Sequence, residues 1–124
     1  MEKLLHYIWK HRILPLSELR TTDGRSVEVI DPGLLNMHAG PDFFNAKVRI
    51  DGVMWVGNVE IHERSADWFL HGHDTDAAYN NVVLHVAAVV DADVVTERGD
   101  RLPQVQLAVP QQVLSNYRRL LAFD

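Results

Sequence analysis

Two runs of strand-like sequence joined by Asp51-Gly52 constrain the fold of this chain more than any other feature. Residues 44–50 alternate between apolar and polar side chains, and residues 53–61 again have the composition of a strand. Such alternation places one set of side chains on each face of a sheet. An Asp-Gly pair between two such runs favours a tight turn, because both residue types tolerate positive φ angles. The sequence therefore predicts an antiparallel β-hairpin.

The remaining pattern adds helices and further strands around this hairpin. Residues 82–90 are continuously apolar and β-branched, which is typical of a central, parallel strand buried on both faces. In chain order we expect a helix over Glu2–Arg12 that Pro15 closes, a strand over Ser26–Ile30, a loop over Leu34–Pro41, the hairpin, a short helix over Asp76–Asn80, the strand Val82–Val90, a second hairpin formed by Asp93–Thr96 and Leu102–Leu107, and a last helix from Pro110. This order predicts an α+β fold with a mixed β-sheet, in which an αβββαβ core is followed by a β-hairpin and a C-terminal helix.

The composition fits one globular domain. The chain has 124 residues, of which 47% are hydrophobic and 23% charged, and it contains no cysteine. A chain of this size buries enough apolar surface to fold without a disulfide or a structural metal, so a metal site in it would point to function. The lack of cysteine excludes disulfides and thiolate ligands and suits a reducing, cytoplasmic location. The charged residues among the first twelve exclude a signal peptide and a membrane span.

The charge balance bears on the partners of the protein. A net charge of -5 argues against nucleic-acid binding through bulk charge. Five basic residues close to the hairpin in sequence could still form a local basic patch: Arg20, Arg25, Lys47, Arg49 and Arg64. Nucleic acid therefore stays a candidate partner, whereas a membrane does not.

Polar residues with catalytic chemistry gather near the hairpin. Glu60 and His62 are two positions apart on one predicted strand, so their side chains leave the sheet on the same face. Asp42 stands at the start of the neighbouring strand, and the hairpin brings it close to Glu60. A carboxylate and an imidazole placed in this way could share a metal ion or a water molecule.

The hairpin register decides whether Asp42 joins this pair. If Asp51-Gly52 forms a two-residue turn, Asp42 points away from the face that carries Glu60, although this register gives the cleaner apolar face. If residues 50–52 instead form a three-residue loop with a glycine bulge, Asp42 lies directly opposite Glu60. A bulge near Gly57, or irregular backbone just before residue 42, would turn Asp42 back even in the first register.

A second candidate site follows the hairpin. His71 and His73 are separated by one glycine and could bind zinc with His62 or Asp74 as the third ligand, which would leave one position open for water. His85 lies inside an apolar strand and is typical of a hydrogen-bonded core histidine.

Several short motifs resemble a bacterial protein family known only as a domain of unknown function. Together they extend over nearly the whole chain: Gly40–Ala46 (GPDFFNA), Gly57–His62 (GNVEIH), Ser65–Trp68 (SADW), His71–His73 (HGH) and Leu84–Val86 (LHV). Members of that family are usually much longer. The resemblance therefore implies that residues 1–124 form the N-terminal domain or a fragment of a longer protein, whose remainder is an expected partner.

A second resemblance is confined to a motif. Pro41-Asp42, a spacer of 17 residues and Glu60-Ile61-His62 resemble the PD-(D/E)xK phosphodiesterases, the restriction-endonuclease-like nucleases, which share the αβββαβ order. This resemblance implies that Asp42 and Glu60 bind Mg²⁺ or Mn²⁺, that the Ile61 carbonyl is a third ligand, and that His62 replaces the usual lysine. A neutral imidazole at that position could accept a proton from water or bind the metal itself.

Three functions are compatible with these patterns. The first is a metal-dependent phosphodiesterase of nuclease type, with Asp42, Glu60 and His62 as catalytic residues. The second is a non-catalytic structural or interaction domain whose polar cluster is a hydrogen-bond network. The third is a zinc hydrolase built on His62, His71 and His73. Residues that could support or replace the metal ligands are Glu28, His71, His73, Asp67, Asp76 and Tyr79.

Overall fold

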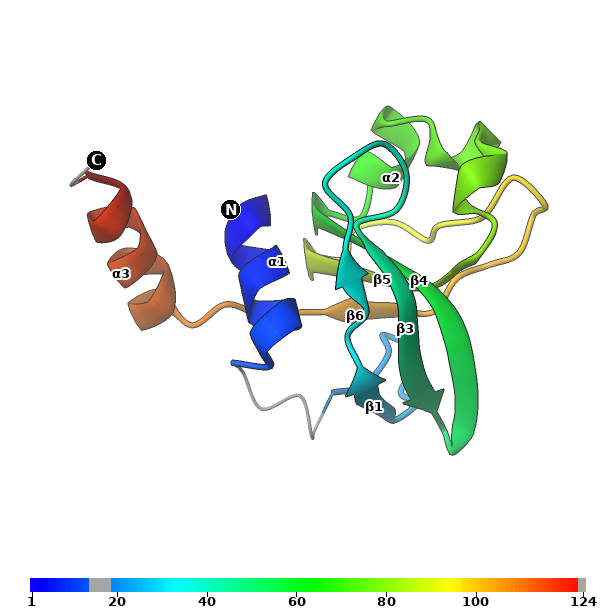
Figure 1. The fold of residues 1–124 in the computed structure, drawn as a ribbon, viewed down its shortest axis with the longest axis horizontal. Coiled ribbons are helices and arrows are strands. Elements are labelled where there is room, and N and C mark those ends of the chain that lie inside the picture. Colours follow the sequence, from blue (N-terminus) through cyan, green and yellow to red (C-terminus); the bar gives the residue numbers. More distant parts are fainter. Residues whose placement is uncertain (14–18, 123–124) are drawn as a thin grey trace.

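The computed structural model of the protein, shown in Figure 1, describes residues 1–13 and 19–122. The α+β class predicted from the sequence is confirmed, with a mixed sheet of six strands and helices at both ends. The elements are α1 (Glu2–His11), β1 (Val27–Asp31), β2 (Leu34–Leu35), β3 (Phe43–Ile50), β4 (Val53–Arg64), α2 (Asp67–Leu70), the 3₁₀ turns η2 (His73–Thr75) and η3 (Ala77–Tyr79), β5 (Val82–Val89), β6 (Gln104–Gln106) and α3 (Gln111–Ala122).

The sheet divides into an antiparallel half and a parallel half. Its strand order is β1-β3-β4-β5-β6, and the short β2 pairs with β3. The pairs β1–β3 and β3–β4 are antiparallel, whereas β4–β5 and β5–β6 are parallel. The apolar β5 therefore is a central, parallel strand, as its continuous hydrophobic run predicts.

The β3–β4 hairpin combines features of both registers considered above. Ile50 pairs with Val53, so Asp51 and Gly52 form a two-residue turn in which both φ angles are positive, at 47° and 81°. Farther from the turn the register shifts by one residue, because Phe43 pairs with Val59. Asn45 lies within the shifted segment and has a φ of 56°, the conformation that a bulge residue can adopt. This bulge reverses the orientation that the tight turn alone would give to Asp42.

The main hydrophobic core lies between α1 and one face of the sheet. The apolar stripe of α1 is buried, and Trp9 also donates a hydrogen bond from Nε1 to the Pro32 carbonyl at 3.0 Å. Val59 and Ile61 of β4 belong to this core. Since side chains alternate along a strand, Glu60 and His62 leave β4 on the opposite face. A smaller core on the other side contains Trp68, Tyr79, Val82, Val94 and Leu102.

Three local predictions were wrong. The second hairpin is reduced to one antiparallel bridge between Val95 and Arg101, flanked by hydrogen bonds that join residues 94–96 to residues 100–102. Its expected second strand is wrong, because residues 104–106 pair in parallel with β5 instead. The open edge of β5 offers residues 104–106 backbone hydrogen-bond partners along their whole length, whereas pairing back across the turn at residues 97–100 does not. The helix expected over Asp76–Asn80 is a single 3₁₀ turn, and Leu34–Leu35 form a strand within the expected loop. Pro15 lies outside the described residues.

The last helix, α3, lies on the far side of α1 from the sheet in Figure 1. Its partly buried residues Val113, Leu114 and Tyr117 pack against the main core, whereas Leu120 and Leu121 are exposed. Among the described residues, no helix combines the length and the apolar character that crossing a membrane requires.

Candidate metal centre

The bulge in β3 places Asp42 beside Glu60. The Asp42 backbone N–H donates to Glu60 Oε1 at 3.1 Å, and Asp42 Oδ2 accepts the Ile61 backbone N–H at 2.8 Å. Asp42 and Glu60 thus lie in the proximity that the sequence suggested. The Ile61 side chain is in the core and its backbone N–H is bonded to Asp42, while its carbonyl stays a predicted metal ligand.

Two histidines meet Glu60 from the other side, and a third lies beside them. Glu60 Oε2 lies 3.3 Å from His62 Nε2 and 2.7 Å from His73 Nε2. The ring centroid of His71 lies 5.0 Å from that of His62 and 5.6 Å from that of His73. Each of the three histidines offers one ring nitrogen, and these nitrogens lie within 4.8 Å of one another. We call His62, His71 and His73 the histidine cluster.

His73 shows why this cluster resembles a ligand set. The residue is only 6% exposed, yet neither of its ring nitrogens has a hydrogen-bond partner within the described part of the chain. The 2.7 Å contact between His73 Nε2 and Glu60 Oε2 is close but does not have hydrogen-bond geometry. Donor atoms of a metal site approach one another in this way, because each points at a shared ion rather than at its neighbour.

A buried chain of hydrogen bonds fixes the tautomer of His62. Gln104 lies 2.8 Å from the Ala92 carbonyl oxygen, and since a carbonyl can only accept, the Gln104 amide group must face it. Gln104 Oε1 then faces His85 Nδ1 at 2.8 Å, which makes that nitrogen the donor. His85 Nε2 is left with its lone pair and lies 2.7 Å from His62 Nδ1.

It follows that His62 donates its Nδ1–H to His85 and keeps a bare Nε2 lone pair on the side of Glu60 and His73. A metal-binding histidine needs this form, in which one nitrogen is free and the other donates to a fixed partner. His85 is fully buried, as expected for a core histidine, and the structure adds a positioning contact that the sequence did not predict.

Burial favours the neutral form of His62, His73 and His85. It lowers the pKa of His62 to about 3, with His85, His73 and His71 adding to the effect, and the pKa of His85 to about 4 despite the Gln104 bond. Burial also lowers the pKa of His73. The site therefore presents imidazole lone pairs, the form that binds metal, at neutral pH.

The pKa values of the two carboxyls shift in opposite directions. Burial raises the pKa of Glu60 to about 10, and the side chain of Asp42 adds to the rise through its contact and its negative charge, whereas the Asp42 backbone N–H opposes it. Burial alone would raise the pKa of Asp42, but its contacts with His6, Glu60 and the Ile61 N–H outweigh burial and hold that pKa below its ordinary value. At neutral pH Asp42 is ionised and Glu60 is protonated, so the contacts of Glu60 with His62 and His73 are not ion pairs.

Aromatic side chains hold His73 in place. Tyr79 stacks on its ring with centroids 3.7 Å apart and an angle of 18° between the ring planes. Trp68 meets the same ring edge-on at 5.2 Å and donates a hydrogen bond from Nε1 to the Val95 carbonyl. Tyr79 thus supports the site through His73, and burial raises the pKa of its own hydroxyl to about 12.

The other residues considered from the sequence lie in different surroundings. Glu28 is exposed on β1 and pairs with Arg49, whose Nη1 lies 2.8 Å from Glu28 Oε2. Asp67 accepts the Arg64 backbone N–H at 3.3 Å, and Asp76 caps the Ala78 N–H at 2.9 Å. These local bonds account for the three carboxylates without a metal.

Three residues near the site were not anticipated. Gln104 gave no signal in the sequence, because its partner His85 lies 19 residues away on another strand. Glu2 and His6 could have been paired from the sequence, since residues four apart on a helix share one face. His6 Nε2 lies 3.3 Å from Asp42 Oδ2.

Comparison with models of known protein families identifies the family of this chain. A family model described as "Protein of unknown function (DUF2851)" matches residues 2–124. The chain belongs to this DUF2851 family. Comparisons with curated proteins and with solved structures find no match. Membership of DUF2851 agrees with the resemblance seen in the sequence motifs and assigns no activity.

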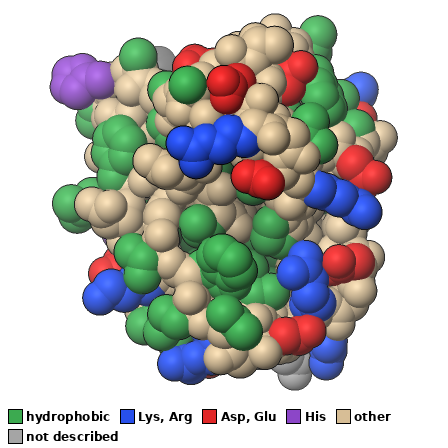
Figure 2. Space-filling view, turned by 90° about the vertical axis from the view of Figure 1, so that its right-hand side faces the viewer, with side chains coloured by type: hydrophobic (Ala, Val, Ile, Leu, Met, Phe, Trp, Pro, Cys, Tyr) green, Lys and Arg blue, Asp and Glu red, His purple; other side chains and the backbone are tan. Residues whose placement is uncertain are grey.

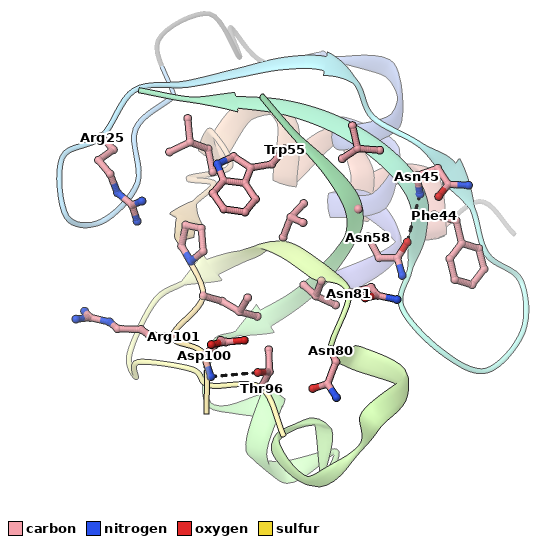
Figure 3. Close-up of a pocket in the computed structure, with 17 residues that line it drawn as sticks. Arg25, Phe44, Asn45, Trp55, Asn58, Asn80, Asn81, Thr96, Asp100 and Arg101 are labelled. Atoms are coloured by element: carbon pink, nitrogen blue, oxygen red, sulfur yellow. Dashed lines mark hydrogen bonds between the residues drawn. The ribbon is translucent and has the colours of Figure 1, made fainter. Parts of the chain in front are cut away.

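This DUF2851 chain also has a cavity, which lies near the hairpin. Its volume is about 850 Å³, and its lining includes Trp55, Asn58, Asn80, Arg25 and Arg101. Figure 2 shows apolar side chains gathered in a hollow with charged side chains around it, and Figure 3 shows Arg25 and Arg101 near one end of the cavity. The cavity and the metal centre share β4, which contributes residues 55–58 to the cavity and residues 60 and 62 to the centre.

Proposed function

We propose that this domain is a metal-dependent hydrolase whose divalent ion is held by His62, His71 and His73, next to Glu60. The observation that carries the proposal is the bare Nε2 of His62, fixed by the buried chain through His85 to Gln104 and directed to the same point as His73. A histidine with a purely structural role in the core would be expected to have a hydrogen-bond partner at Nε2 as well as at Nδ1.

The ligand chemistry favours zinc. Three imidazoles suit Zn²⁺ and other borderline ions, whereas Mg²⁺ prefers oxygen ligands. A catalytic zinc site typically has three protein ligands and one open position. His71 is exposed while His62 and His73 are buried, so solvent and a substrate can approach the cluster from the side of His71. A bound ion would polarise a substrate oxygen and lower the pKa of a bound water.

Glu60 supplies the acid–base group. A cation competes with the proton on the Glu60 carboxyl, so metal binding would convert Glu60 into a carboxylate within reach of a water molecule. The Asp42 N–H holds Glu60 Oε1, which leaves Oε2 facing the histidines. Glu60 can then accept the proton of the attacking water.

The second part of the proposal is that the substrate is a phosphodiester, and the position of Asp42 favours this substrate. The bulge at Asn45 returns Asp42 to the Glu60 side, which is the arrangement that the PD-(D/E)xK resemblance requires. In this version Asp42 and Glu60 bind Mg²⁺ or Mn²⁺, and His62 stands in the place of lysine. Arg25 and Arg101 on the cavity would offer contacts to a nucleic-acid backbone, although the net charge of -5 opposes it.

Metal content and hydrolysis test these versions together. The protein, purified with a C-terminal tag that lacks histidine, is analysed for metals and assayed on bis-p-nitrophenyl phosphate, DNA and RNA. We expect about one zinc or more per chain and hydrolysis that both His71→Ala and Glu60→Gln abolish. His38→Ala, which changes an exposed loop histidine, is the matched control and should behave as wild type.

The outcomes separate the hypotheses. Weak, exchangeable Mg²⁺ or Mn²⁺ with activity lost in Asp42→Ala supports the nuclease version. A melting temperature that ignores every metal, with a Glu60→Gln variant that loses stability but has no activity to lose, supports the non-catalytic domain and overturns the proposal.

A further inference from the structure

A second group of ligand-type side chains lies beside the histidine cluster. Glu2, His6 and Asp42 each offer one atom, and these atoms lie within 4.8 Å of one another. Glu2 and His6 stand four residues apart on one face of α1, and Asp42 comes from the segment just before β3. We call these three residues the helix cluster.

His6 is oriented toward Asp42 without making a hydrogen bond. Its Nε2 is shielded from solvent and has no hydrogen-bond partner among the described residues, although Asp42 Oδ2 lies 3.3 Å away. Phe43 holds the ring edge-on, with centroids 5.8 Å apart and an angle of 87° between the planes. A buried nitrogen aimed at a carboxylate, yet not bonded to it, has the same character as the nitrogens of His73.

Glu60 lies between the two clusters. Its Oε1 faces Asp42, whose backbone N–H it accepts at 3.1 Å. Its Oε2 faces His62 and His73 at 3.3 and 2.7 Å. One oxygen of this buried carboxyl thus contacts the backbone of Asp42 in the helix cluster, and the other faces the histidine cluster, so Glu60 is the residue placed to join the two groups.

We propose that Glu2, His6 and Asp42 bind a second divalent cation, and that Glu60 bridges it to the ion in the histidine cluster. This inference adds to the proposed function and rests on it for the first ion, and it makes Glu60 a bridging ligand in place of the base that it is with one ion bound. The second site offers two carboxylates and one imidazole, a harder set than three imidazoles, so it suits Mn²⁺ or Mg²⁺ as well as Zn²⁺. Two bridged ions can stabilise both the attacking and the leaving oxygen of an in-line displacement, which makes phosphate esters the substrate class of the pair.

Stoichiometry is the direct test. Metal-stripped protein with the histidine-free C-terminal tag is titrated with Zn²⁺ and with Mn²⁺ by calorimetry, and metal retained after gel filtration is counted. We expect two ions per wild-type chain, one in His6→Ala and one in His71→Ala. His11→Ala removes an exposed histidine from the same helix and should still bind two.

The magnetic signature of manganese adds a readout that a structural role would not change. Two bridged Mn²⁺ ions give an exchange-coupled electron paramagnetic resonance spectrum, whereas separate ions give the six-line pattern of mononuclear Mn²⁺. We expect the coupled spectrum in wild type and the six-line pattern in His6→Ala. Glu2→Gln, a nearly isosteric change on the half-buried face of α1, serves as the second variant should His6→Ala fail to fold.

The possible results differ for the two proposals. One ion per wild-type chain, unchanged in His6→Ala and Glu2→Gln but lost in His71→Ala, overturns the second site and leaves the histidine site intact. Two ions with an uncoupled spectrum remove the bridge by Glu60. No bound ion at all overturns this inference together with the proposed function.

Discussion

The tautomer of His62 is a direct consequence of the buried hydrogen bonds, and replacing Gln104 with leucine should release it. In wild type the acceptor-only Ala92 carbonyl orients Gln104, Gln104 makes His85 Nδ1 a donor, and His85 Nε2 accepts the proton of His62 Nδ1. Gln104→Leu keeps a similar side-chain volume but removes the first acceptor. His85 is then free to turn its proton toward His62, which moves the His62 proton to Nε2, where it blocks the metal.

The size of the effect follows from these contacts. Losing a hydrogen-bonded partner of a metal-binding histidine weakens metal affinity by about 10–100-fold, which corresponds to about 1.4–2.7 kcal/mol. Gln104→Leu also leaves two groups without their partner, His85 Nδ1 and the Ala92 carbonyl oxygen, and each such loss costs about 1–3 kcal/mol of folding stability. We therefore expect both a lower melting temperature and a weaker metal affinity.

Long-range ¹⁵N–¹H correlation spectra report the tautomer of each histidine directly. In metal-stripped wild type at pH 7, His62 should carry its proton on Nδ1 and have a bare Nε2. The matched control is Gln106→Leu, two residues farther along β6, because the exposed Gln106 side chain accepts the Val90 N–H and makes no hydrogen bond with the histidines in the described part of the chain. It should leave the tautomer and the metal affinity unchanged. A wild-type His62 protonated on Nε2, or a folded Gln104→Leu variant with wild-type metal affinity, would refute the reasoning.

Three further predictions concern the bulge, a close backbone approach and pH. Asn45→Val should lower the free energy of unfolding by about 1–2 kcal/mol, because a β-branched residue is strained at a φ of 56°. It should also weaken metal binding by displacing Asp42. Asn45→Gly should have neither effect, and calorimetry of both variants checks this. Gly57→Ala should lower the unfolding free energy by about 1–3 kcal/mol, since its Cβ would lie 2.4 Å from Val83 Cγ1 and 2.6 Å from the Asn81 carbonyl oxygen; a denaturant midpoint equal to wild type would contradict this close approach. Because the pKa of Glu60 is raised to about 10 and a bound metal ion displaces its proton, the metal affinity should increase about tenfold for each pH unit below that pKa. Calorimetry in buffers of different ionisation enthalpy counts the protons released on metal binding, and Glu60→Gln should release one proton fewer than wild type.

Sequence patterning anticipated the elements that depend on local signals. The Asp51-Gly52 turn, the apolar stripe of α1 and the parallel character of β5 each follow from residue periodicity, because a fixed side-chain spacing meets a fixed backbone geometry. The candidate ligands Asp42, Glu60, His62, His71 and His73 could also be named from their residue types and spacing. The parallel pairing of residues 104–106 with β5 was missed, since it depends on a strand edge that no local pattern reveals.

The tertiary structure decided how those ligands are used. One extra residue in β3 reverses the side-chain alternation, so the bulge at Asn45, and not the turn, brings Asp42 to Glu60. The bare Nε2 of His62 depends on Gln104, which reaches it only through His85 across two parallel strands. By itself, the sequence determined which side chains were available for metal chemistry. Only the packed sheet decided which atoms carry lone pairs and which carry protons, because hydrogen-bond partners far apart in the chain meet only in the folded protein.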